Sequence, residues 1–571
     1  MNLPKTGFPM RAGLSKSEPK RLKDWQDNKV YEQVLKKNEG HKKFVLHDGP
    51  PYANGPIHIG HAMNKISKDM INRYWMMQGY EVPYVPGWDC HGQPIEHKVE
   101  EKLGTEKFNQ TSTAKIRELC NKFAVENIEL QKAGFRRLGV LGDWDNPYLT
   151  LYHQHDAADI EVFKAMFDKG MIYRGHKPVH WCKHCHTALA EAEIEYSDET
   201  SPSIFVRFEM TSKPAGLENF DGPVDFIIWT TTPWTLPSNT ALAVGPEIEY
   251  VRVKCRNPYT DAPQTVILAK ELLGSYFTPK MEGKFEISPV TYKGPDFEGI
   301  RYEQLIPWVK PAGDAFRVIL GDYVTTSDGT GIVHIAPTFG ADDDRVARAA
   351  GIAPLFMVDK AGKNQPMVDR KGRFFLLEEL DPTFIRDNVD TAAYSQWAGR
   401  YVKNAYDDSL AADAPTLDVD LSVMLKAENK VFKIEKHTHS YPHCWRTDKP
   451  VLYYPLDSWF IRTTALRDRM IELNKTIRWK PESTGTGRFG KWLEGLVDWN
   501  LSRSRFWGTP LPIWATEDYS EMKCIGSVEE LVAEIEKSVA ASLMKENPYK
   551  NFKPGDLSKE NYSTDRIDLH R

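Results

Sequence analysis

The sequence changes character near residue 200 and changes back near residue 450, and this limits the possible folds. Residues 44–180 alternate short apolar runs with amphipathic helical stretches, which is typical of a parallel α/β domain. Residues 201–395 contain many short β-branched runs separated by Gly, Pro and Asp, which predicts a mostly β domain. We therefore predict an α/β fold in which a doubly wound sheet is interrupted by an inserted, mostly β domain.

The composition is that of a large globular protein. The chain has 571 residues, so several domains are expected. Its hydrophobic content of 41% and charged content of 27% are ordinary, and no stretch is apolar enough to predict a membrane span or a signal peptide. Seven cysteines in so long a chain favour a reducing compartment, so we expect a cytoplasmic protein.

Charge is unevenly distributed along the chain. The net charge of −5 does not by itself indicate nucleic-acid binding. Residues 1–43, by contrast, hold eleven Lys/Arg against five Asp/Glu. This bias would suit contact with a polyanion, or it marks a solvated helical face.

A strand–turn–helix junction is predicted between residues 44 and 79. Residues 44–46 form a short apolar strand, and the Gly/Pro-rich segment after it predicts a turn. Met63, Met70 and Tyr74 then recur at helical spacing, with Lys65 on another face. Gly79 is a favourable residue to end that helix.

The motif H-x-G-H lies where this helix should begin. A helix N-terminus offers unpaired N–H groups and partial positive charge to an anion, and His58 and His61 can add hydrogen bonds to phosphate oxygens. Gly60 would let a flat group approach the backbone. Because so short a motif occurs often by chance, an ordinary pair of exposed or helix-capping histidines is an open alternative.

Five longer segments, in order along the chain, resemble the isoleucyl-tRNA synthetases, which are class I aminoacyl-tRNA synthetases. The segments are HDGPPYANGPIHIGHAMNK, YVPGWDCHGQPIEHKVE, WTTTPWTLPSNTALAV, GTGIVHIAPTFGADDD and DWNLSRSRFWGTPLPIW. The corresponding segments of the valyl and leucyl enzymes look different, and GWDCHG followed by PIE favours isoleucine. A related enzyme for valine or leucine, or a non-catalytic tRNA-binding derivative, are the other readings.

The resemblance implies an isoleucine–tRNA ligase. Such an enzyme activates isoleucine with ATP and Mg²⁺, transfers it to tRNA(Ile), and hydrolyses misactivated or mischarged valine. We expect a monomer with no membrane partner. The implied domains are an N-terminal extension (1–43), the first half of a Rossmann-type catalytic domain (44–200, with a ribbon at 181–196), an inserted editing domain (201–395), a return connection with a ribbon (396–450) and an incomplete second catalytic half (451–571).

The resemblance also assigns roles to residues of the synthetic site. His58 and His61 would be catalytic and, with Gly60, would bind ATP. Asp89 would bind the α-ammonium group of isoleucine, although it could instead cap a local turn. The isoleucine side chain would be lined by Pro50 and by a tryptophan, for which Trp507 is preferred to Trp514. Gln93 stands where the family usually has Leu.

Editing would use two segments of the inserted domain. Thr230, Thr231 and Thr232 match the threonine-rich strand of the family, although threonine is also common in ordinary strands. Asp343 would bind the ammonium group of the misattached amino acid, with an uncertainty of one residue within the run of three aspartates. His334 would shape the pocket against isoleucine.

A metal site is a further prediction. Cys182 and Cys185 form a C-x-x-C pair, and Cys444 is followed by Thr447 where a second pair would have its other thiol. Zinc would then need a fourth ligand, for which His443, His184 or His186 are candidates. The alternative is a ribbon that keeps its fold without the metal.

Two features of the family are not found in the sequence. These are a lysine-rich K-M-S-K-S-like motif and a helical anticodon-binding domain. We therefore expect a truncated chain that binds and activates isoleucine poorly but has a complete editing domain.

Overall fold

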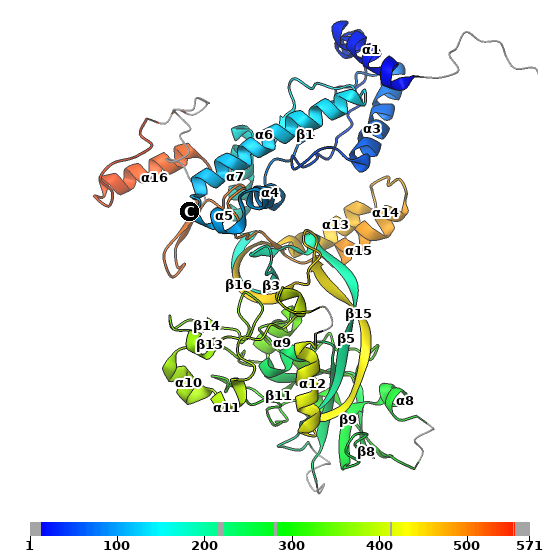
Figure 1. Cartoon of the computed structure of the whole chain (residues 1–571), viewed down its shortest axis with the longest axis vertical. Helices are drawn as coiled ribbons and strands as arrows, with labels where there is room; N and C mark the ends of the chain where they lie inside the picture. The colour runs from blue at the N-terminus through cyan, green and yellow to red at the C-terminus, as the bar shows by residue number, and fades with distance from the viewer. Residues whose placement is uncertain (1–12, 215–221, 279–282, 412–413, 552, 554–571) are drawn as a thin grey trace, which may run out of the picture. The chain divides into compact units, whose positions relative to one another are not determined.

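The computed structural model describes residues 13–214, 222–278, 283–411, 414–551 and 553, and the chain divides into two compact units. The first comprises Met1–Gly170 with Arg505–Arg571, and the second comprises Met171–Ser504. Figure 1 labels many of the helices and strands of both units. Within the described residues, none of the helices combines the length and apolar character needed to cross a bilayer.

The first unit is mostly helical, with a small parallel pairing of strands. Strands β1 and β2 pair in parallel, and the isolated bridges Lys43–Glu81 and Tyr52–Asp89 are parallel as well. This is the hydrogen-bonding pattern expected for an α/β domain. Its elements are α1 (Leu14–Asp27), α2 (Val30–Lys37), α3 (Ile59–Met77), β1 (Gly87–Trp88), α4 (Gln93–Leu103), α5 (Thr105–Gln110), α6 (Thr113–Arg137), β2 (Tyr148–Leu149), α7 (His153–Asp168), β18 (Ile513–Ala515), β19 (Met522–Cys524) and α16 (Val528–Ala540).

Helix α3 confirms the predicted helix but reverses its expected amphipathicity. Its apolar residues Met63, Met70 and Tyr74 are exposed, whereas its buried residues include Lys65 and Asp69. The helix ends at Met77, and Gly79 adopts φ 82° just beyond it, a backbone conformation that favours glycine. Periodicity located the helix correctly, but it did not identify the buried face, because polar partners elsewhere in the unit satisfy the buried charges.

The second unit is mostly β and confirms the predicted fold class of an α/β protein with a β-rich insertion. Its sheets have the strand orders β10-β8-β9-β6-β5-β15, β11-β7-β12 and β17-β16-β3-β4, and β13 pairs with β14. The strands are β3 (Ile172–Cys182), β4 (Thr187–Leu189), β5 (Ile194–Glu209), β6 (Asp225–Thr230), β7 (Ala241–Val244), β8 (Glu249–Arg256), β9 (Pro263–Ala269), β10 (Glu286–Lys293), β11 (Arg317–Leu320), β12 (Ile332–Ile335), β13 (Met357–Val358), β14 (Asn364–Gln365), β15 (Val431–Cys444), β16 (Leu452–Ile461) and β17 (Trp499–Asn500).

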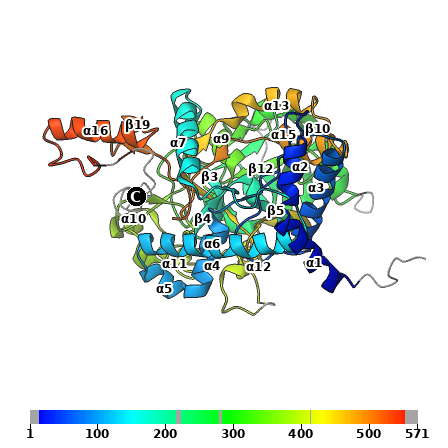
Figure 2. The same cartoon turned by 90° about the horizontal axis from the view of Figure 1, so that it is seen from above.

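Short helices accompany these sheets. Helix α12 packs on β5 and β15, and α13 and α15 lie side by side in both views (Figure 1, Figure 2). The helices are α8 (Leu273–Tyr276), α9 (Ala341–Ala349), α10 (Pro382–Asn388), α11 (Thr391–Tyr394), α12 (Leu417–Ala427), α13 (Arg467–Asn474), α14 (Ser483–Thr486) and α15 (Arg488–Glu494), with a 3₁₀ turn, η2, at Pro233–Ser238.

Two long antiparallel ribbons, β3–β16 and β5–β15, belong to the second unit. Residues 171–200 and 451–504 are therefore in the same compact unit as the β-rich insertion. The catalytic and editing domain limits given by the resemblance stay a prediction.

Candidate functional site

The two histidines of the H-x-G-H motif cap helix α3. His58 is the N-cap, and its Nδ1 accepts a hydrogen bond from the Gly60 N–H at 3.1 Å. The Nδ1 of His61 in turn accepts from the His58 N–H at 3.3 Å, and the two ring centroids are 3.9 Å apart. Helix capping is thus realised in the structure.

Capping also decides which ring nitrogen can act on a ligand. In a neutral imidazole, a nitrogen that accepts a hydrogen bond leaves the proton on the other nitrogen. His58 and His61 therefore both carry an Nε2–H, and neither Nε2 has a hydrogen-bond partner among the described residues. Burial, His58 and Lys65 lower the pKa of His61, which favours its neutral form. The capping and anion-binding interpretations are compatible.

Gly60 is required by this geometry. A Cβ at position 60 would lie 2.9 Å from Cε1 of His58, so any side chain there would displace the capping ring. The structure thus gives Gly60 a steric role that is independent of any ligand.

A buried cluster of charged and polar side chains, here called the Asp48 clamp, fixes α3 to the segment before it. Asp48 forms ion pairs with Lys65 and Lys68 of α3, and the Tyr84 hydroxyl donates to its carboxylate at 2.7 Å. The side chains of Asp48 and Lys65 are each only 3% exposed. Burial alone would raise the pKa of Asp48, but the hydrogen bonds from these three residues hold it below its usual range. Sequence reasoning missed this cluster, whose only signal was a pair of lysines on one helical face.

The residues predicted to bind the substrate isoleucine belong to neighbouring segments of the first unit. Residues 50–53 run beside Asp89, with the Asp89 N–H donating to the Pro51 carbonyl at 2.9 Å. Trp507 is buried, and its indole N–H donates to the Cys90 carbonyl at 2.7 Å. Trp514 is 44% exposed and lies in β18, so the structure favours Trp507 as the residue next to the Asp89 segment.

Asp89 and its neighbours have the properties of a partly desolvated site. Burial raises the pKa of Asp89 despite a hydrogen bond from the His91 N–H, so a cationic ligand would stabilise the carboxylate. Gln93 is buried, and neither of its amide atoms has a hydrogen-bond partner among the described residues.

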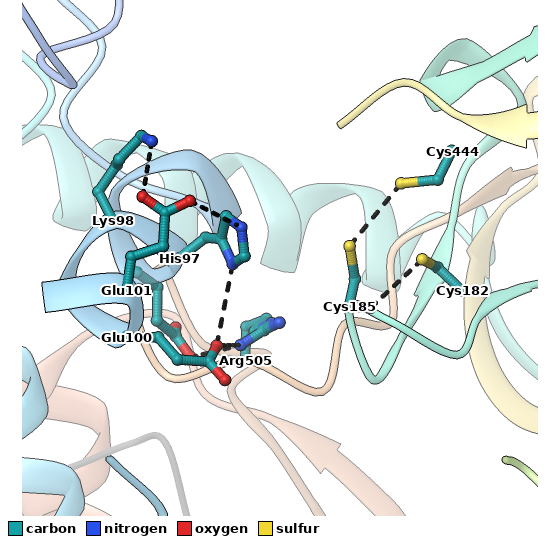
Figure 3. Close-up of polar contacts among 9 residues, drawn as sticks. His97, Lys98, Glu100, Glu101, Cys182, Cys185, Cys444 and Arg505 are labelled. Atoms are coloured by element: carbon teal, nitrogen blue, oxygen red, sulfur yellow. Dashed lines mark hydrogen bonds and ion pairs between the residues drawn. The ribbon is translucent and has the colours of Figure 1, made fainter. Parts of the chain in front are cut away.

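Glu96 holds the Trp507 segment in place. Its carboxylate accepts the N–H groups of Phe506 and Trp507, both at 2.9 Å, and it is buried beside Arg505. Arg505 also pairs with Glu100 at 3.3 Å (Figure 3). Glu96 is the last residue of the PIE segment, but nothing in the sequence indicated that it would hold Trp507 in place.

In the second unit, the threonine-rich segment and His334 are joined by a residue that the sequence did not single out. Thr230 ends β6, and its Oγ1 accepts the Thr232 N–H at 3.1 Å, while Thr231 and Thr232 are half-buried. The Thr235 hydroxyl donates to the Thr232 carbonyl at 2.9 Å and lies 3.1 Å from Nε2 of His334. Burial lowers the pKa of His334 to about 4, so this histidine is neutral near pH 7.

Asp343 is connected by a hydrogen bond to the segment that carries His334. It is in the first turn of α9, and its carboxylate accepts the Ala336 N–H, two residues after His334, at 2.8 Å. Its carboxyl group is surrounded by protein atoms, which raises its pKa to about 7 although Ala336 and Tyr323 hydrogen-bond to it. Asp344 instead pairs with Arg348, which supports the choice of Asp343 within the aspartate run.

The three predicted cysteine ligands converge. The thiol sulfurs of Cys182, Cys185 and Cys444 lie within 4.8 Å of one another and are buried (Figure 3). The separation of 3.7 Å between Cys185 and Cys444 is close to the value of about 3.8 Å that tetrahedral zinc with bonds of about 2.3 Å imposes. The donor set therefore fits zinc.

The fourth position of that cluster differs from the prediction. Among the described residues, no histidine nitrogen belongs to this group of sulfur atoms. His443 instead contacts Glu199 and Ser197, at 3.1 and 2.9 Å. The hydroxyl of Thr447, the residue that stands where a second C-x-x-C pair would have its other thiol, lies 3.9 Å from the Cys182 sulfur.

Replacing Asp48 by Asn should lower the free energy of unfolding of this chain by about 3–5 kcal/mol, because it leaves two lysines next to a neutral group. The contribution should be fully present above the unfolded-state pKa of about 3.9 and should be lost as the pH falls through the lower folded-state pKa. A series of denaturant titrations from pH 7 down to pH 2 measures both effects. Asp27→Asn, which removes an exposed pair with Lys23 at 2.8 Å, is the matched control and should change stability little. Equal losses in the two variants would contradict the clamp.

Comparison with known proteins identifies the family. Residues 20–567 match the family described as tRNA synthetases class I (I, L, M and V). The chain is 51% identical to an isoleucine–tRNA ligase of Bacteroides fragilis and 49% identical to one of Porphyromonas gingivalis, in each case over 98% of this chain. It covers 50% and 51% of those relatives, so the chain spans about half of their length.

Solved structures give more distant matches. A ternary complex of an Agrobacterium radiobacter K84 leucyl enzyme, LeuRS-tRNA-LeuAMS, matches with 16% identity and a TM-score of 0.35, over 91% of this chain and 53% of that one. The family match spans nearly the whole chain and carries the assignment alone. This chain belongs to the class I tRNA synthetases of the I, L, M and V group.

Proposed function

We propose that the protein is an isoleucine–tRNA ligase that also removes valine by hydrolysis. The observation that carries this proposal is the identity of about half of all residues with isoleucine–tRNA ligases over 98% of the chain. It favours isoleucine over valine or leucine. The retained histidines, threonines and Asp343 argue against a non-catalytic derivative.

In the proposed activation step, a carboxylate oxygen of isoleucine attacks the α-phosphorus of ATP, and pyrophosphate leaves as the new acyl-phosphate bond forms. ATP enters with Mg²⁺ as a substrate. The chemistry needs donors placed where negative charge develops. The Nε2–H groups of His58 and His61, beside the N-terminus of α3, supply such donors. Asp89 binds the ammonium group, and Pro50 and Trp507 line the side-chain pocket.

Replacing His58 or His61 by Ala should lower the rate of isoleucine-dependent ATP–pyrophosphate exchange by about 10²-fold. Each variant lacks one hydrogen-bond donor that would stabilise the negative charge of the transition state. Isoleucine binding should change much less. The assay uses a fusion of this chain with the second half of the Bacteroides fragilis relative, which gives it the relatives' full length. Isoleucine affinity falling as much as the exchange rate would refute the role of these donors.

Editing follows from the physical limit of the isoleucine pocket. A missing methylene changes binding by only about 1–3 kcal/mol, and isoleucine against valine is the standard example of this limit. A second site must therefore hydrolyse the smaller product. We assign it to Thr230–Thr232, His334 and Asp343. Asp343 binds the ammonium group, the neutral His334 restricts the pocket, and the threonine hydroxyls orient the terminal ribose and the attacking water.

This chain should deacylate valyl-tRNA(Ile) rapidly and isoleucyl-tRNA(Ile) slowly. The kcat/KM for valyl-tRNA(Ile) should rise from pH 6 to pH 8, because the pKa of Asp343 is about 7 and only its ionised form attracts the ammonium group. Asp343→Ala should remove most of the activity, whereas Asp342→Ala, a change of its exposed neighbour, should keep it. Loss of both aminoacyl groups at the same rate, or of neither, would contradict the assignment.

We also propose that Cys182, Cys185 and Cys444 hold a structural zinc ion, with Thr447 or a water in the fourth position. Metal analysis after purification without added zinc should find about one zinc per chain. Cys444→Ser should lose the metal, whereas Cys255→Ser, which changes another buried thiol, should retain it. A zinc content near zero in the unaltered chain would reject the site.

The partners proposed for the protein are tRNA(Ile), isoleucine and ATP. A monomeric state and a cytoplasmic location stay predictions.

A further inference from the structure

The helical segment Lys475–Trp492 has a charge that contrasts with the rest of the chain. It contains five Lys/Arg and one Glu, a net charge of +4, in a protein of net charge −5. It includes the loop after α13, together with α14 and most of α15. None of the functions proposed above uses this segment.

Four of its cations are exposed and have no internal partner. Within the part of the chain that the structure describes, the side chains of Lys475, Arg478, Lys480 and Arg488 form no ion pair or hydrogen bond. Of the nearby acidic groups, Glu494 pairs with Lys491 at 2.8 Å and Glu472 pairs with Arg469 at 2.6 Å, and only Glu482 forms no ion pair within the described residues. The cations are therefore available to an external anion.

A cluster of three aromatic rings lies among these cations. The ring centroids of Trp479 and Phe489 are 5.1 Å apart, and those of Phe489 and Trp492 are 5.8 Å apart. Arg478 and Lys480 are the sequence neighbours of Trp479, and Arg488 is the neighbour of Phe489. Three exposed cations are thus each adjacent in sequence to a ring of this aromatic cluster.

The cluster is held rigidly. The Trp479 indole N–H donates to Oδ1 of Asn474 at 2.8 Å, and the Asn474 amide donates to the Gly485 carbonyl at 2.9 Å. A Cβ at Gly485 would clash with the Trp479 ring, so α14 packs directly on this tryptophan. Trp479 is half-buried, whereas its sequence neighbours Arg478 and Lys480 are exposed.

Trp492 adds a second kind of contact. It is 46% exposed at the end of the cluster, and Ile477 nearby in the loop is 50% exposed. An exposed aromatic ring in the same segment as unpaired cations matches the requirements of a single-stranded nucleic acid, whose bases stack on rings while its phosphates contact Lys and Arg. A duplex would use the cations but would offer no free base face to the ring.

We propose that Arg478, Lys480, Arg488 and Trp492 form a binding surface for single-stranded RNA. The three cations contact phosphates, and Trp492 stacks on an unpaired base. That the RNA belongs to a tRNA rests on the proposed function, whereas the surface itself does not.

The test is fluorescence anisotropy of this chain with a labelled 12-nucleotide single-stranded RNA and a duplex of equal length, between 50 and 200 mM salt. The triple variant Arg478→Gln/Lys480→Gln/Arg488→Gln should weaken single-strand binding at least tenfold. It should also reduce the slope of log K against log salt by about 2, since three phosphate contacts are lost. Trp492→Ala should weaken binding about tenfold with an unchanged slope, and Trp492→Phe should restore most of it.

The matched control is Lys310→Gln/Lys360→Gln/Lys371→Gln, which removes the same charge at three other exposed lysines of the second unit. It should leave binding nearly unchanged. Equal weakening by the two triple variants would mean general electrostatic attraction and would overturn the site. Absence of binding by the unaltered chain, or equal affinity for the duplex with no effect of Trp492→Ala, would also overturn it. Circular dichroism and denaturation midpoints verify that each variant is folded.

Failure of the RNA-binding surface and failure of the proposed editing activity would give different results. RNA binding that depends on the four residues, in a chain that hydrolyses no valyl-tRNA(Ile), would keep this surface and count against editing. Rapid editing in a triple variant with unchanged RNA affinity would support editing and count against this surface.

Discussion

The buried carboxylate of Asp48 is the constraint on which the first unit depends. A charge that is removed from water is costly unless it is paired and fully hydrogen-bonded, and Lys65, Lys68 and Tyr84 provide those partners. Since both lysines belong to α3, the clamp fixes the position of that helix relative to the segment that precedes it. The start of α3, and with it the pair of capping histidines, is fixed as a consequence.

The chemistry proposed for the first unit follows from that position. Capping uses Nδ1 of both His58 and His61, so their Nε2–H groups are the donors left for a ligand. Gly60 is needed because a side chain would displace the ring of His58. A structural function, helix capping, therefore selects the tautomer that a phosphate-binding function requires.

In the second unit, hydrogen bonds from backbone N–H groups help to fix the positions of the residues proposed for editing. The Trp234 N–H donates to the buried Asp418 at 2.8 Å and anchors the turn after the threonine-rich segment. The Ala336 N–H anchors Asp343, and Thr235 joins the threonine segment to His334. Residues from β6, β12 and α9 are thus held together by a few hydrogen bonds, while burial of the Asp343 carboxyl keeps its pKa near neutrality.

The sequence by itself determined the fold class, the helix after the H-x-G-H motif and the family, because apolar periodicity, turn residues and long ordered motifs are local properties of the chain. It also named the three cysteines whose sulfur atoms converge. Only the tertiary structure decided which face of α3 is buried, since Lys65 and Asp69 become favourable inside only when distant partners meet them. The same holds for the roles of Glu96, Thr235 and Asp48. The partners that define these roles, Trp507, His334 and Lys65, lie 411, 99 and 17 residues away in sequence, and only folding brings those atoms within hydrogen-bonding distance.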